Sequence, residues 1–186
     1  MLKNVLIISY YWPPSGGPGV QRVLKFCKYL SGFGWNPIVL TVEDGEFPAI
    51  DNSLLKDSIN IECIKVKGFS LFRIFKKLSG KKELPSHQLS PSRNETMITR
   101  IARWVRYNLI IPDGRIGWYR SAVKAGKKII KEKNIDMIFT SGPPQTVHLV
   151  GKSLADKTNT AWVSDFRDPW TDRFYYYENP RNRIIS

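Results

Sequence analysis

Apolar residues are arranged along the chain in two alternating patterns, short continuous runs and longer segments with helical spacing. The first run, Val5–Ile8, is continuous, which is typical of a strand buried on both faces of a parallel sheet. After a loop rich in Pro and Gly, apolar residues recur three and four positions apart from Val20 to Leu30, which indicates a helix. Gly32 and Gly34 are stop signals for that helix. These patterns predict a strand over Asn4–Ser9, a helix over Val20–Leu30 and a strand over Pro37–Val42.

The same alternation continues toward the C-terminus. Further strands are predicted over Asn60–Val66, Asp136–Thr140 and Thr160–Ser164, and further helices over Ser121–Lys133 and Gln145–Lys157. Apolar residues between Ile98 and Leu109 also repeat at helical spacing. Strands that alternate with helices predict an α/β fold with a doubly wound, mostly parallel Rossmann-like sheet and helices on both faces.

Length and composition fit one domain of this class. The 186 residues are 42% hydrophobic and 24% charged, which excludes a disordered tail or a low-complexity chain. The apolar run near the N-terminus is too short for a signal peptide, and no apolar stretch is long enough to cross a membrane. Cys27 and Cys63 are far apart and lack the spacing of a zinc site. We therefore predict a reduced, cytoplasmic protein without a metal site.

The net charge points to a polyanionic partner. The chain has 29 Lys and Arg against 16 Asp and Glu, a formal net charge of +13. Nucleic acid, a phosphorylated substrate and an anionic membrane all fit this charge. No nucleic-acid recognition motif is present, and the Trp residues form no recognisable stacking platform. We therefore expect no nucleic-acid partner.

The positive charge is concentrated in two segments. Residues 64–82 contain seven basic and no acidic residues, and residues 100–131 contain nine basic residues against Asp113 alone. On a helical wheel, the apolar residues of 71–78 lie opposite Arg73, Lys76 and Lys77, which is typical of a helix at a membrane interface. Such a helix can instead cover the domain core with its basic side in solvent. We predict that Arg73, Lys76 and Lys77 contact an anionic membrane surface on the inner face of the plasma membrane.

The loop after the first strand is a candidate binding site. Its glycines allow backbone N–H groups to approach a ligand, and the following helix N-terminus favours an anion. Arg22 adds a cation near that point. The substrate-binding candidates of this loop are Ser15, Gly16, Gly17, Gly19 and Arg22. A tight turn without a ligand is the alternative interpretation. The dinucleotide pattern G-x-G-x-x-G fails because Arg22 stands where its last glycine belongs, although Glu43 and Asp44 lie where a ribose-binding acid would.

Two later loops carry further candidates. Ser141 and Gly142 are small enough to admit a ligand before two prolines that fit the start of a helix, and an ordinary helix boundary is the alternative. His148 lies in that helix, and we expect it to pack rather than to react. The last predicted strand leads into Asp165 and the residues after it.

Two carboxylates there, Asp165 and Asp168, flank Arg167, a pattern that core packing explains poorly. The two acids can orient sugar hydroxyls, and one of them can act as a general base if it reaches the nucleophile. Arg167 can hold a phosphate. A structural network of ion pairs is the alternative for all three.

Four motifs taken together carry a family resemblance. The run Tyr-Tyr-Trp-Pro-Pro-Ser-Gly-Gly-Pro-Gly-Val-Gln-Arg at residues 10–22 resembles the N-terminal signature of glycosyltransferase family 4, which has the GT-B fold. Ile-Pro-Asp-Gly-Arg-Ile-Gly-Trp at 111–118, Thr-Ser-Gly-Pro-Pro at 140–144 and Asp-Phe-Arg-Asp-Pro-Trp at 165–170 look like the branch that assembles polysaccharides. Relatives often have Leu where this chain has Pro169.

The resemblance implies one half of a two-domain enzyme. Family members transfer a sugar from a nucleotide-sugar to an acceptor with retention of configuration, and most need no metal or other cofactor. Their N-terminal domain mainly binds the acceptor, which in this branch is often a glycan or lipid-linked, and their C-terminal domain holds most of the nucleotide-sugar. The resemblance makes Gly16, Gly17 and Gly19 the phosphate-side loop. It makes Asp165, Arg167 and Asp168 acceptor-side or catalytic candidates, of which we single out Asp165 and Asp168 as catalytic.

Length separates this chain from the family. Members are about twice as long, which matches two domains of ordinary size. We therefore expect residues 1–186 to be a truncated N-terminal domain that lacks its C-terminal partner domain and is inactive alone. A non-catalytic Rossmann module that binds a nucleotide is the alternative function.

Overall fold

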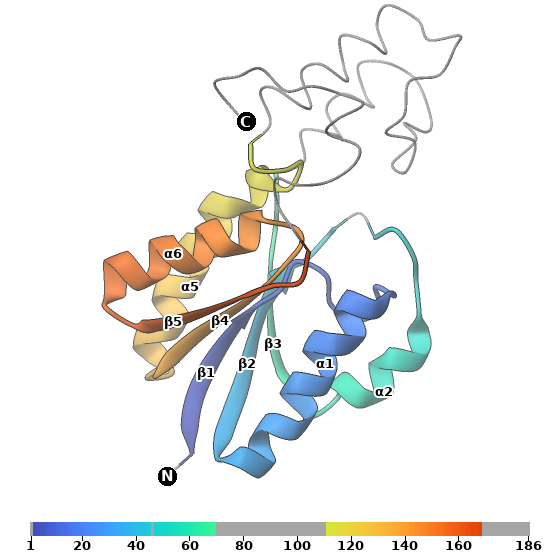
Figure 1. Ribbon diagram of the computed structural model, residues 1–186, viewed down its shortest axis with the longest axis horizontal. Coiled ribbons are helices and arrows are strands. Elements are labelled where there is room, and N and C mark those ends of the chain that lie inside the picture. The colour runs from blue at the N-terminus through green and yellow to red at the C-terminus, as the bar shows by residue number, and fades with distance from the viewer. Residues whose placement is uncertain (1, 46, 70–110, 169–186) are drawn as a thin grey trace, which may run out of the picture.

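The structure is a computed structural model that describes residues 2–45, 47–69 and 111–168. Its strands form one parallel sheet in the order β3-β2-β1-β4-β5, which confirms the predicted α/β fold (Figure 1). The strands are β1 (Lys3–Ile8), β2 (Trp35–Val42), β3 (Glu62–Val66), β4 (Met137–Gly142) and β5 (Ala161–Phe166).

Helices cover both faces of this sheet, as the sequence predicts. α1 (Pro18–Leu30) and the short α2 (Leu55–Ser58) lie on one face, and α5 (Tyr119–Glu132) and α6 (Thr146–Thr158) lie on the other (Figure 1). Three 3₁₀ turns complete the described elements: η1 (Ser31–Phe33), η2 (Asn52–Leu54) and η3 (Ile116–Trp118). The architecture is therefore a three-layer sandwich.

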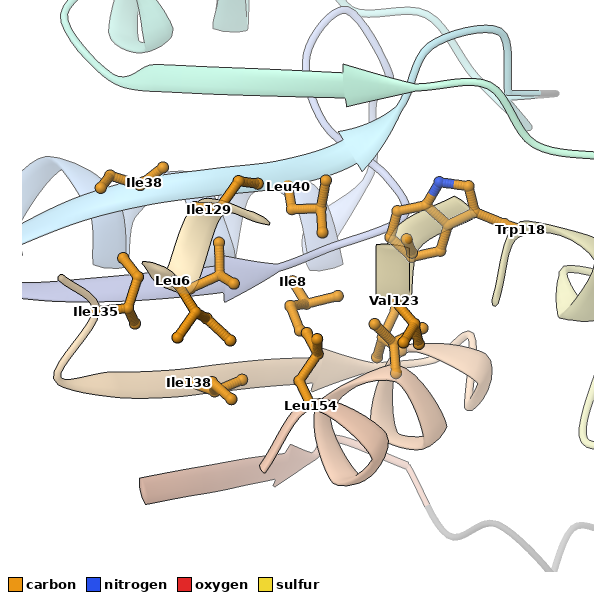
Figure 2. Packing of buried hydrophobic residues seen from close by; sticks show 14 of the residues in the cluster. Leu6, Ile8, Ile38, Leu40, Trp118, Val123, Ile129, Ile135, Ile138 and Leu154 are labelled. Carbon is orange, nitrogen blue, oxygen red and sulfur yellow. The ribbon is translucent and has the colours of Figure 1, made fainter. Parts of the chain in front are cut away.

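Alternation along β1 produces two hydrophobic cores. Leu6 and Ile8 point to the side of α5 and α6, where they join a cluster with residues of β2 and β4 (Figure 2). Val5 and Ile7 point to the other side and pack against α1. All four side chains are almost fully buried, so β1 is apolar on both faces, which explains its continuous apolar run.

The helix after β1 differs from the prediction only at its start. α1 begins at Pro18 rather than Val20, because a proline at the first helical position loses no hydrogen bond. Its end at Leu30 is confirmed. Gly34 adopts a left-handed conformation with φ 80° after η1, which only glycine adopts without strain.

Strands β4 and β5 are longer than predicted. β4 extends to Gly142 and β5 to Phe166, and the two pair in parallel register with Ser141 opposite Asp165. Ser141, Gly142 and Asp165 are polar or small and interrupt the apolar pattern, whereas the backbone pairing continues as far as Phe166. This extension places the candidate residues of two loops side by side on one sheet edge.

Strand order indicates which part of the sheet is expected to bind a ligand. The chain leaves β1 toward β2 on one side and re-enters beside β1 at β4, so the switch in strand order lies between β1 and β4. Ligands of open α/β sheets bind beyond the carboxyl ends of the strands at this switch. All strand ends that carry candidate residues point to the same edge (Figure 1).

Some predictions fall outside the described residues. Arg73, Lys76 and Lys77, and the helical pattern of 98–109, belong to residues 70–110, of which nothing is described. None of the helices in the described part is long and apolar enough to cross a membrane. Within the same residues, no group of three His, Cys, Asp or Glu side chains is placed to hold a metal ion.

Candidate functional site

Asp165 joins three elements at the carboxyl edge of the sheet. Its two carboxylate oxygens accept hydrogen bonds from Arg22 Nε and Nη2, both at 3.0 Å, and one of them also accepts from Ser141 Oγ at 2.9 Å. Arg22 comes from α1, Ser141 from β4 and Asp165 from β5. The Arg22 side chain is 49% exposed, so this bidentate pair contributes about 1 kcal/mol or less to stability. Its main effect is to fix the position of the carboxylate.

Arg167 closes the next part of the same edge. Its Nε donates to the Gly142 carbonyl and its Nη2 to the Pro143 carbonyl, each at 2.9 Å. A β-carbon on Gly19 would overlap Arg167 Nη1, so the guanidinium lies directly on the backbone of the first turn of α1. Burial lowers the pKa of Arg167, and the nearby Asp168 and Asp165 oppose that shift. Arg167 thus connects the loop after β4 to the glycine loop.

The glycine loop is held from its other side by residues 49–51. Gly16 N donates to the Ala49 carbonyl at 2.9 Å, and Asp51 N donates to the Pro14 carbonyl at 2.8 Å. A β-carbon on Gly16 would lie 3.1 Å from Asp51 Cβ, so this glycine permits close packing. Gly17 has φ 110°, a glycine conformation, and the space beside it is open. Among the three glycines of this loop, Gly17 is therefore the one that requires glycine for its backbone angles.

Ser15 forms a β-bridge with Ile50 on this side of the loop. Its side chain is fully buried, and its Oγ has no hydrogen-bond partner among the described residues. Ser15 and Gly16 therefore face residues 49–51, whereas Gly19 and Arg22 face β5. The structure brings Gly19, Arg22, Ser141, Gly142, Asp165 and Arg167 together at one edge.

The motif at 111–118 contributes a helix cap that sequence reasoning missed. Asp113 Oδ2 accepts from the Thr146 backbone N–H and Oδ1 accepts from Thr146 Oγ1, both at 2.8 Å. The N-terminus of α6 has no cap from its own flanking residue, so a carboxylate 33 positions earlier supplies it. Asp113 also accepts from Arg115 N at 2.8 Å. The quoted Pro-Asp-Gly-Arg motif was the available signal, but it did not show which helix the acid caps.

Arg115 connects this motif to the loop after β1. Its guanidinium lies over the rings of Tyr10, at 5.2 Å, and Tyr11, at 6.0 Å. Tyr10 in turn meets Trp118 edge to face at 5.5 Å. Cation–π contacts of this kind contribute about 0.5–1 kcal/mol each at partly exposed positions. The motifs at residues 10–22 and 111–118 therefore pack directly on each other.

His148 is packed, as the sequence predicts, but it retains one free ring nitrogen. Its Nδ1 lies 2.9 Å from Thr140 Oγ1, and its ring stacks on Phe166 with centroids 4.1 Å apart. Burial lowers the pKa of His148 to about 4, so the ring is neutral at pH 7. Its Nε2 has no hydrogen-bond partner within the described part of the chain.

These groups define what the edge can bind. Arg22 and the N-terminus of α1 supply positive charge and backbone donors, which suit an anion. Asp165 is a carboxylate whose position is fixed by two neighbours, which suits it to orient a hydroxyl. Asp168 lies two residues after the end of β5, and its negative charge raises the pKa of Arg167 against the effect of burial. The arrangement thus places a cation and backbone donors beside a carboxylate at one edge of the sheet.

Comparisons with known proteins leave the family open. No family model matches the chain, and no curated protein matches it. Among solved structures, a glycosyltransferase from Rickettsia africae matches at 16% identity with a TM-score of 0.46, over 96% of this chain and 34% of that one. The C-terminal domain of the PF1911 hydrogenase from Pyrococcus furiosus matches at 12% identity with the same TM-score, over 88% of this chain and 91% of that one. Both TM-scores are low, so neither likeness decides the function.

Proposed function

We propose that this chain is the acceptor-side domain of a retaining glycosyltransferase that uses a nucleotide-sugar. The supporting observation is the convergence of the quoted motifs at one edge of the sheet. The Arg22–Asp165 pair joins the first motif to the last, and Arg167 joins the last motif to the loop after β4. Asp113 of the remaining motif caps the helix that follows this loop.

Each candidate residue takes a role in this proposal. The phosphate side consists of Ser15, Gly16, Gly17, Gly19 and Arg22. Further substrate contacts come from the adjoining Ser141, Gly142 and Arg167. Asp165 and Asp168 act on the acceptor hydroxyl or the reacting sugar. The acceptor is a glycan or a lipid-linked molecule, and no cofactor is needed beyond the nucleotide-sugar co-substrate. Most of the nucleotide-sugar binds to a second domain, which is the partner of this one.

A transfer assay on the enzyme encoded by the intact reading frame tests this proposal. The enzyme is incubated with radiolabelled UDP-, GDP- and dTDP-sugars and with a lipid extract of the source membranes. We expect label in the lipid or glycan fraction from one donor, with the anomeric configuration of that donor retained. Absence of transfer from every donor would overturn the proposal, and an inverted product would overturn its retaining part.

The alternative is a non-catalytic nucleotide-binding module. Its support is the sheet order together with Glu43, which follows β2 and whose backbone N–H donates to the Val66 carbonyl at 2.9 Å. Micromolar binding of UDP, ATP or NAD by residues 1–186 alone favours this module. The glycosyltransferase proposal expects weak binding, because it assigns most donor contacts to the other domain.

A further inference from the structure

Two buried polar atoms at the carboxyl end of β4 have no hydrogen-bond partner among the described residues. They are His148 Nε2 and Gln145 Oε1. The residues His148 and Gln145 are 3% and 5% exposed, respectively. Both lie beside Gly142. A β-carbon on this glycine would overlap His148 Nε2 and come within 3.1 Å of Gln145 Oε1. Because Gly142 has no β-carbon, both polar side chains can approach this end of β4 closely.

The hydrogen-bond chain behind His148 determines which of its ring nitrogens carries the proton. Trp162 Nε1 can only donate, and it donates to Thr140 Oγ1 at 3.0 Å. The Thr140 hydroxyl is buried, and its own hydrogen needs an acceptor. His148 Nδ1, at 2.9 Å, is the acceptor that the structure offers. Since a neutral imidazole has one N–H, the proton of His148 then lies on Nε2.

The two unpartnered atoms are thus a donor and an acceptor. A buried polar group without a partner costs about 1–3 kcal/mol, so a ligand group that pairs with both atoms removes a substantial penalty. A hydroxyl group accepts one hydrogen bond and donates another, so one hydroxyl satisfies both atoms. A carboxylate or phosphate would leave Gln145 Oε1 facing another acceptor, and an ammonium group would face the His148 N–H donor.

We propose that His148 and Gln145 form a binding position for one hydroxyl group of a sugar. The choice of a sugar among hydroxyl-bearing ligands rests on the glycosyltransferase proposed above, whereas the donor–acceptor pair stands without it. The position lies beside Gly142, whose carbonyl accepts from Arg167, and Gly142 follows Ser141, whose hydroxyl holds Asp165. A sugar bound at this edge of the sheet therefore directs one hydroxyl toward His148 Nε2 and Gln145 Oε1. A trapped water has the same chemistry and is the competing occupant.

Nuclear magnetic resonance of the histidine ring separates these two occupants. The probes are the methyl α-glycosides of glucose, galactose and mannose, added in millimolar steps to the ¹⁵N-labelled chain. Dioxane, a ring ether without hydroxyls, is the matched control. We expect at least one glycoside to shift the His148 Nε2–Hε2 signal in a saturable way and dioxane to leave it unchanged. A long-lived water contact at Hε2 that no glycoside displaces would overturn the proposal.

Variants test the two side chains individually. His148→Phe keeps a ring that can stack on Phe166 but removes the N–H donor, and Gln145→Met removes the acceptor at similar volume. Each is expected to weaken glycoside binding at least fivefold. His148→Gln, which restores an amide donor near the Nε2 position, is expected to retain more of the affinity than His148→Phe. If circular dichroism shows that all three variants are folded, and each binds the glycosides as tightly as the unaltered chain does, the proposal is contradicted.

The outcomes distinguish this inference from the proposed function. If glycosides shift the His148 signal but the full enzyme transfers no sugar, the hydroxyl position stands and the glycosyltransferase proposal fails. If the enzyme transfers sugar while no glycoside affects His148, the enzyme class stands and this inference fails.

Discussion

At the scale of single residues, several candidate side chains prove to hold one another in place. Arg22 and Ser141 both bind Asp165, and Arg167 binds the loop after β4 while lying against Gly19. The sequence indicated that these residues belong to a site, but spacing alone does not show which side chains meet. Contacts between residues more than a hundred positions apart depend on the folded sheet.

The close approach of Arg167 to Gly19 predicts a specific cost of adding one methyl group. Gly19→Ala forces the guanidinium away, and loss of its two carbonyl bonds should lower the unfolding free energy by about 1–3 kcal/mol. Gly32→Ala is the matched control, because nothing lies within 4 Å of its added carbon, and it should be neutral or slightly stabilising. Urea denaturation measures both. Equal effects would show that the Gly19–Arg167 contact is unimportant.

The depressed pKa of His148 predicts that stability falls in mild acid. The folded-state pKa, about 4, lies below the ordinary histidine value of 6.5, so the unfolded chain binds the proton more tightly between these values. Stability is therefore lost as the pH falls from 6.5 toward 4, by up to about 1.4 kcal/mol per pH unit. Asp165 and Asp113 favour the charged ring and Arg167 opposes it. Urea denaturation between pH 7 and pH 4.5 measures the free energy of unfolding of the chain and of its His148→Gln variant. This free energy should decline less steeply with falling pH in the variant.

At the scale of elements, the order of strands and helices was predictable because burial dictates their patterns. β1 is apolar because both faces are covered, and α1 repeats its apolar residues because one face packs on the sheet. The ends of β4 and β5 were not predictable. Ser141 and Gly142 have no strand pattern of their own and become strand by pairing with Asp165 and Phe166. The short α2 was missed because one turn shows no period.

The remote cap of α6 predicts a measurable loss of stability. Asp113→Ala leaves the Thr146 backbone N–H and hydroxyl without their acceptor, and should cost about 1–2 kcal/mol, as removal of other helix caps does. Asp156→Ala removes an exposed carboxylate from the same helix, where it pairs with Lys152, and should cost about 0.5 kcal/mol or less. Thermal denaturation compares the two. A loss no larger than that of the control would contradict the capping role.

At the scale of the whole molecule, the excess of positive charge remains the least explained feature. The net charge of +13 predicts attraction to an anionic surface, and the seven basic residues of 64–82 are the densest cluster. Most of that cluster lies outside the described residues, so the membrane contact stays a prediction. The α/β class, in contrast, was predictable from the alternation of strands and helices along the chain, although the strand order was not.

Charge reversal tests the membrane prediction. Lys76→Glu with Lys77→Glu should reduce sedimentation of the chain with phosphatidylserine vesicles by tenfold or more, since each basic residue near the surface contributes about 1 kcal/mol. Lys124→Glu with Lys127→Glu makes the same change of net charge on exposed positions of α5. If both pairs reduce sedimentation equally, the attraction belongs to the overall charge and not to the cluster.

The central claim is that the edge built around Asp165 carries out sugar transfer, and one measurement tests it most directly. The initial rate of transfer from the preferred nucleotide-sugar is compared between the full-length enzyme, its Asp165→Asn variant and its Asp156→Asn variant. Asn retains the size of the side chain but loses the charge that Arg22 pairs with. We predict that Asp165→Asn lowers the rate by about a hundredfold or more, as loss of a group that stabilises a transition state does, while Asp156→Asn leaves it unchanged. An unchanged rate in Asp165→Asn would contradict the account.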